Sequence, residues 1–226
     1  MQDYAQPTRP KLHAAVLASS TLLAAGFVSH HPTISSSDPD GAIAEILAEA
    51  GVNGTVHGSL IVILGLWWLS VRTLLSVHGS LGMTARIGLF CYGFGLATTS
   101  AAAMCSGFLA PEVASNFASA ESTEGFLDLL RLVYSMNQTA DRFGMLGMTL
   151  GVVLLTAAML RQSRAHAWVM SVGLAATCLS LVILLARWST VGVSEVWIFL
   201  GGQAVWNLGL AALTFLGQRD QPSIDN

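Results

Sequence analysis

The chain has 226 residues, of which 53% are hydrophobic and only 10% are charged, and its formal net charge is −3. A typical soluble domain carries about 25% charged residues. This composition therefore excludes a soluble globular enzyme, a disordered chain and a protein that binds nucleic acid through a basic patch. It predicts a protein whose main partner is the lipid bilayer.

Six apolar stretches are long enough to cross a membrane, because a spanning helix needs about 20 mostly apolar residues. They cover residues 12–29, 57–75, 85–110, 143–160, 166–186 and 196–216. None of them alternates with period two, so helices are expected rather than barrel strands. We predict an all-α, polytopic membrane protein with six transmembrane helices in three hairpins, forming a single integral-membrane domain over residues 1–226.

Small residues and aromatic residues in the spans predict structural roles. Glycines recur in the third stretch, which is therefore expected to pack most tightly; these are Gly88, Gly93, Gly95 and Gly107. Trp67 and Trp68 are typical of anchors at a membrane interface. The three cysteines are expected to be free thiols, since Cys91 and Cys105 lie about 21 Å apart along one helix.

Two longer segments, residues 30–56 and 111–138, interrupt the spans on one side of the membrane. Ile43, Ile46 and Leu47 follow helical spacing in the first segment, and Asp40 is a suitable N-terminal cap for that helix. The second segment has a similar amphipathic pattern. We predict one amphipathic helix in each segment, folded over the outer face of the bundle.

The distribution of basic residues predicts the orientation of the chain, because cytoplasmic loops are enriched in Lys and Arg. With the N-terminus inside, seven basic residues flank the inner ends of the spans and three flank the outer ends. The inner set is Arg9, Lys11, Arg72, Arg86, Arg161, Arg164 and Arg219, and the outer set is Arg131, Arg142 and Arg187. We therefore expect both termini in the cytoplasm and the protein in a bacterial inner membrane.

Histidines at the outer boundary are the main candidates for chemistry. His30 and His31 end the first span and His57 begins the second, so a hairpin brings them to the same depth. Asp141 stands just before the fourth span. The first and second hairpins resemble each other weakly in sequence, and this duplication would place Asp141 at a position equivalent to His57. Imidazoles and a carboxylate are ligands for transition metals. This set predicts a metal or haem b site at the periplasmic face, with a role in redox chemistry or metal handling.

Two other functions fit the same sequence. No specific catalytic motif is present, and the polar outer face is also typical of an accessory subunit that binds another membrane protein. A small-molecule transporter would use a polar cavity between the helices. The residues expected to line such a cavity are Asn137, Asp141, Arg142, Gln203 and Asn207. Interhelical hydrogen bonding is the structural alternative for Gln203 and Asn207.

Overall fold

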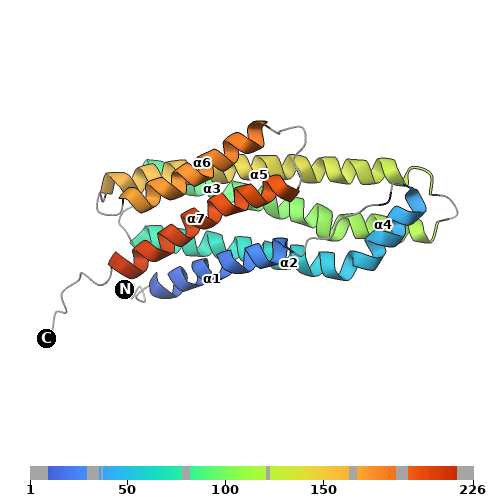
Figure 1. Ribbon diagram of the computed structural model, residues 1–226, viewed down its shortest axis with the longest axis horizontal. Coiled ribbons are helices and arrows are strands. Elements are labelled where there is room, and N and C mark those ends of the chain that lie inside the picture. The colour runs from blue at the N-terminus through green and yellow to red at the C-terminus, as the bar shows by residue number, and fades with distance from the viewer. Residues whose placement is uncertain are drawn as a thin grey trace, which may run out of the picture.

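The computed structural model describes residues 10–29, 36, 38–77, 82–120, 123–162, 167–186 and 193–217. These residues form helices and no strand, which confirms the all-α prediction (Figure 1). The helices are α1 (Pro10–Val28), α2 (Pro39–Val77), α3 (Met83–Met104), the π-helix η1 (Cys105–Leu109), α4 (Ala110–Ala118), α5 (Phe126–Gln162), α6 (Ala167–Ala186) and α7 (Val193–Gly217).

Five helices in this described part are long and apolar enough to cross a membrane. They are Pro10–Val28, Pro39–Ser76, Met83–Ala118, Phe126–Leu160 and Val196–Leu216. Helix α6 has a shorter apolar stretch, Met170–Ile183. Five of the six predicted spans therefore coincide with helices of sufficient length and apolarity, and a crossing by α6 stays a prediction.

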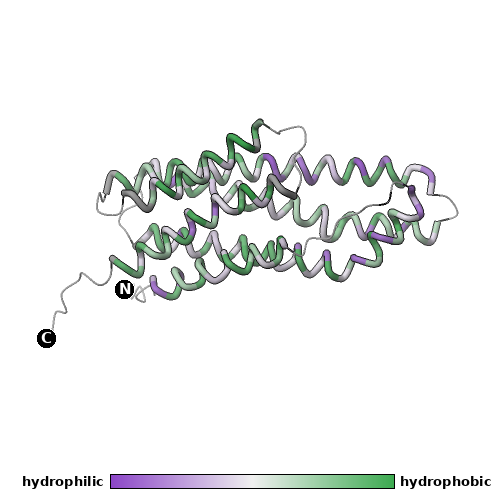
Figure 2. Tube along the Cα trace, viewed as in Figure 1, coloured by the Kyte–Doolittle hydropathy of each residue, from purple (hydrophilic) through white to green (hydrophobic). Residues whose placement is uncertain are grey.

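Three of the helical runs are much longer than a bilayer requires. Helix α2 has 39 residues and α5 has 37, which corresponds to about 58 and 55 Å against a hydrocarbon core of about 30 Å. The run through α3, η1 and α4 is also continuous. All three extend the bundle at its right-hand end in Figure 1, which we call the α4 end, and hydrophilic residues gather there (Figure 2).

This arrangement corrects the expectation for the segments at residues 30–56 and 111–138. Their described parts do not form separate helices folded over the bundle, but continue α2, α4 and α5 beyond the apolar stretches. The reason is a second hydrophobic core at the α4 end, in which apolar stripes of the three helices bury one another. We call it the α4-end core; it contains Ala42, Ile43, Ile46, Ala110, Val113, Ala114, Phe126, Leu130 and Val133.

The first turn of α2 is capped by Asp38 rather than by the expected Asp40. The backbone N–H of Gly41 donates a hydrogen bond of 2.8 Å to Oδ1 of Asp38. Pro39 is the first helical residue, a position that suits proline and makes the preceding residue the cap. The hydrogen bond from Gly41 is the main reason why the pKa of the exposed Asp38 carboxyl lies below its usual value.

The helices α1, α2, α3, α5, α6 and α7 form a closed ring. Contacts join α1 to α2, α2 to α3, α3 to α5, α5 to α6, α6 to α7 and α7 back to α1, and the contact of α3 with α5 is the most extensive. Glycines make the contact of α3 with α5 possible. A Cβ atom on Gly147 would lie 2.9 Å from Cα of Gly95, and a Cβ on Gly151 would lie 2.6 Å from Cβ of Tyr92. The expectation of tight packing for the third stretch is thus confirmed.

A larger hydrophobic core, which we call the main core, lies between the helices of the ring; it includes Leu17, Leu74, Tyr92, Met148, Leu155 and Leu210. Polar side chains join helices inside it. Nδ2 of Asn207 on α7 donates to Oγ1 of Thr21 on α1 at 3.3 Å, and the hydroxyl of Tyr92 on α3 donates to Oδ1 of Asn207 at 3.4 Å. The indole N–H of Trp206 donates to Oγ1 of Thr156 at 3.0 Å. These bonds tie α7 to three other helices, as interhelical hydrogen bonds do in a membrane.

Candidate functional site: a cavity where the two cores meet

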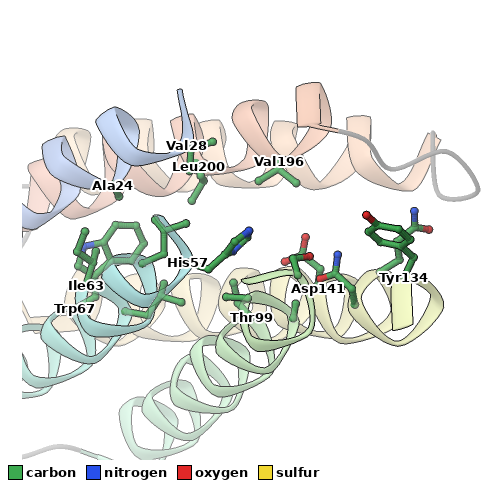
Figure 3. Close-up of a pocket in the computed structure, with 17 residues that line it drawn as sticks. Ala24, Val28, His57, Ile63, Trp67, Thr99, Tyr134, Asp141, Val196 and Leu200 are labelled. Carbon is green, nitrogen blue, oxygen red and sulfur yellow. The ribbon is translucent and has the colours of Figure 1, made fainter. Parts of the chain in front are cut away.

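A cavity of about 240 Å³ lies between the helices where the main core gives way to the α4-end core. Its walls come from α1, α2, α3, η1, α5 and α7 (Figure 3), and the lining residues are Ala24, Val28, His57, Leu60, Ile63, Leu64, Trp67, Thr99, Ala102, Ala103, Ser106, Tyr134, Asn137, Gln138, Asp141, Val196 and Leu200. An apolar cavity of about 150 Å³ is known to hold benzene. The present cavity therefore has room for a somewhat larger organic molecule.

One face of α5 supplies most of the polar lining. Tyr134, Asn137, Gln138 and Asp141 are spaced by three or four residues, so they share one side of the helix. Figure 3 shows Asp141 projecting into the cavity near Thr99 of α3. None of the residues that the structure describes donates a hydrogen bond to the Asp141 carboxylate or forms an ion pair with it.

The π-helix η1 packs directly against His57 and its helix α2. A π-turn disrupts the regular hydrogen-bond ladder of a helix, and here the carbonyl oxygen of Ser106 accepts a hydrogen bond of 2.7 Å from Nδ2 of Asn53. Gly107 lies directly against His57, so that a Cβ atom on this glycine would collide with Cβ of the histidine. As a result, His57 is only 6% exposed and its ring points into the cavity (Figure 3).

The other half of the cavity is apolar. Val28, Val196 and Leu200 face His57 and Asp141 across it, while Ile63 and Trp67 lie toward the end away from Tyr134 (Figure 3). Our expectation that Trp67 anchors the chain at a membrane interface is wrong, because its side chain is 1% exposed. Its indole Nε1 has no hydrogen-bond acceptor among the described residues.

The structure brings some of the predicted ligand set together. His57 and Asp141 line the same cavity, whereas His30 and His31 lie outside the described residues. Within the described ranges, no group of three or more His, Cys, Asp or Glu side chains is placed to hold a metal ion. A metal or haem site at this end would therefore depend on His30 or His31.

Only some of the residues expected around a transporter cavity line the cavity in the structure. Asn137 and Asp141 line the cavity. The guanidinium of Arg142 donates to Oε1 of Gln138 at 3.3 Å, and Asn207 forms the interhelical bonds described above. Gln203 is fully buried, and neither its Oε1 nor its Nε2 has a hydrogen-bond partner among the described residues.

Several lining residues were not predicted from the sequence, although their spacing carries a signal. Leu60, Leu64 and Trp67 follow His57 at intervals of three and four residues, so they share its face of α2. Tyr134 stands two helical turns before Asp141 in the same way. Tracing helical neighbours from the polar residue at each boundary would have found both rows.

No protein-family model, curated protein or solved structure matches this chain. Its function is therefore inferred from the cavity and the side chains around it.

Proposed function

We propose that this protein is an integral membrane protein that binds a small amphipathic molecule in the cavity between its helices. One observation carries the proposal, namely that the cavity has a polar half around His57 and Asp141 and an apolar half around Ile63 and Trp67. Ligand sites in proteins are concave and mostly apolar, with a few polar groups that orient the ligand. A polar residue in a membrane bundle is also a functional candidate by default.

The proposal includes the arrangement in the membrane predicted from the sequence. We propose six spans, with α6 as the fifth, both termini in the cytoplasm and a bacterial inner membrane as the location. The α4 end and the polar half of the cavity would then face the periplasm. The excess of basic residues at the opposite ends of the spans supports this orientation.

The test is a cavity-filling substitution with a matched control on the same helix. Ala103 of α3 lines the cavity, whereas Ala101 is exposed on the surface of the bundle. We expect 2-phenylethanol, a small neutral amphiphile, to bind the wild-type protein in nanodiscs. The Ala103→Leu variant should lose this binding because the added side chain occupies the space of the probe, and Ala101→Leu should keep it.

The contrast between the two variants is the measured quantity, since the probe also partitions into lipid. Saturation-transfer NMR reports the bound fraction. Equal binding by the wild-type protein and Ala103→Leu, or no saturable binding by the wild-type protein, would contradict the proposal. It would favour the accessory-subunit function instead.

A second candidate function is the metal or haem site predicted from the sequence. The placement of His57 and Asp141 on one cavity favours it, because these two residue types are metal ligands. If His30 or His31 completes the set, the purified protein should show a Soret band or a stoichiometric metal. Whichever signal is found should disappear in His57→Ala. It should persist in His78→Ala, because His78 follows the opposite end of the second apolar stretch. A colourless, metal-free wild-type protein would rule out this function.

A further inference from the structure

We propose that the ligand of this cavity is a cationic amphiphile, an organic amine or ammonium ion, and that Asp141 is its counter-ion. This inference rests on the proposed function and adds the chemical class of the ligand. It follows from the charges that face the cavity, from the lack of a partner for one of them and from the arrangement of the two halves.

The cavity has one acidic side chain and, among its described lining residues, no lysine or arginine. The titratable groups that face it are Asp141, His57 and Tyr134. Asp141 forms no ion pair with His57 or with any other described residue. An anionic ligand would meet this carboxylate without a compensating cation, whereas an ammonium group would provide the missing partner.

The energetic reason is desolvation. A carboxylate held away from bulk water is costly unless an opposite charge or hydrogen-bond donors compensate it. The neighbouring cation, Arg142, donates to Gln138 and is not among the residues that line the cavity. An ammonium ion carries several N–H donors, which the carboxylate of Asp141 and the side-chain oxygens of Thr99 and Asn137 could accept.

The geometry also fixes the orientation of the ligand. Asp141 lies toward one end of the cavity and Trp67 lies toward the other, beyond His57 (Figure 3). A positive head group at Asp141 would therefore direct the apolar body of the molecule toward Ile63 and Trp67. Tyr134, on the far side of Asp141, adds an aromatic ring to the lining at this end of the cavity, and aromatic rings attract cations.

The experiment compares three probes of similar size that differ in charge: 2-phenylethylamine, 2-phenylethanol and phenylacetate. Binding is measured at neutral pH in nanodiscs of phosphatidylcholine, a zwitterionic lipid that does not concentrate amines. We expect the wild-type protein to bind the amine at least about tenfold more tightly than the alcohol, as a charge-assisted hydrogen bond would give. Phenylacetate should bind most weakly.

Two variants on α5 identify the group responsible. Asp141→Asn should lose the preference for the amine while its affinity for 2-phenylethanol changes less than about threefold, which also shows that the variant is folded. Asp128→Asn is the matched control, because Asp128 is an exposed carboxylate on the same helix that pairs with Arg131. It should keep the preference.

The outcomes separate this inference from the proposed function. Equal binding of amine and alcohol by the wild-type protein, or an unchanged preference in Asp141→Asn, overturns the cationic ligand but leaves the cavity as a binding site. Preferential binding of phenylacetate overturns it as well. Failure of all three probes to bind the wild-type protein overturns both proposals.

Discussion

The close contact between α3 and α5 gives the sharpest prediction about stability. Replacing Gly95 with alanine would place a Cβ atom against the backbone nitrogen of Met148 and 2.7 Å from the carbonyl oxygen of Gly144. Carbon atoms pack best at about 3.5 to 4 Å. Because two of the opposing atoms belong to the backbone of α5, a side-chain rotation cannot relieve the overlap, and the helices must move apart by at least about 0.8 Å.

The cost follows from the contacts that this movement weakens. A gap of 0.5–1 Å removes about a quarter to a half of the attraction of each atom pair, which is about 0.1–0.2 kcal/mol at its best. For about 50 pairs, the number that one buried leucine makes, at about 0.15 kcal/mol each, the loss is about 2–4 kcal/mol. Alanine regains up to about 1 kcal/mol through its higher helix propensity. The free energy of unfolding of Gly95→Ala should therefore fall by about 1–4 kcal/mol.

Gly65→Ala is the matched control, because nothing lies within 4 Å of the Cβ that it would add to α2. This variant should be as stable as the wild-type protein or up to about 1 kcal/mol more stable. Unfolding by SDS in mixed micelles, followed by circular dichroism, measures both. If Gly95→Ala is no less stable than Gly65→Ala, the glycine-mediated contact of α3 with α5 is not as close as described.

Further predictions concern four single substitutions. Gly107→Ala should lower the free energy of unfolding by about 1–3 kcal/mol and abolish probe binding in the NMR assay, because its Cβ collides with the histidine that lines the cavity. Gln203→Leu should raise SDS resistance because the amide has no partner among the described residues, whereas Asn207→Leu should lower the unfolding free energy by about 1 kcal/mol by removing two interhelical hydrogen bonds. Asp38→Ala should speed hydrogen exchange in the first turn of α2. Acid should also speed this exchange in the unsubstituted protein. Because the pKa of Asp38 is lowered in the folded protein, its stabilisation of the first turn is present above the unfolded pKa of 3.8 and is lost as the pH falls through the folded pKa.

Each of these predictions has an outcome that would contradict it. A cap at Asp40 would be indicated if Asp40→Ala, and not Asp38→Ala, increased exchange at the start of α2. Equal destabilisation by Gln203→Leu and Asn207→Leu would show that the Gln203 amide is hydrogen-bonded. Gly201→Ala adds its Cβ to open space on α7, so it should lower neither stability nor binding. A loss there would show that any alanine substitution is harmful.

The sequence predicted where the chain can cross a membrane, but not where its helices begin. Hydropathy indicates the start of an apolar stretch, which is His57 for the second span, whereas the helix begins at Pro39. The polar residues between them remain helical because the extensions of α4 and α5 provide a surface for the stripe of Ile43 and Ile46. The third span was expected to end before Pro111, yet this residue stands in the first turn of α4 directly after the π-turn, where the missing N–H is tolerated.

The candidate site was predictable in depth but not in rotation about the helix axes. A position in a span gives the distance from the membrane boundary, which suggested one level for His57 and Asp141, and both residues line the same cavity. It does not say which way a side chain points, since that depends on which neighbouring helix packs against each face. For this reason Gln203 and Asn207 were expected beside Asp141, and Trp67 was not.

In the membrane arrangement proposed above, the unequal lengths of the helices would make the cavity sensitive to bilayer thickness. Helices α1 and α6 have 19 and 20 residues, about 28 and 30 Å, which match a hydrocarbon core of about 30 Å without tilting. In the same arrangement, α2 and α5 would pass through this layer, and the α4-end core joins them to each other beyond it. In a thicker membrane, α1 would have to shift or draw the lipid toward it, at a cost of fractions of a kcal/mol per Å. Residues of α1 line one wall of the cavity, and residues of α2 and α5 line the opposite wall (Figure 3). A shift of α1 would change the distance between these walls, so the length of the lipid acyl chains would alter the affinity for the ligand.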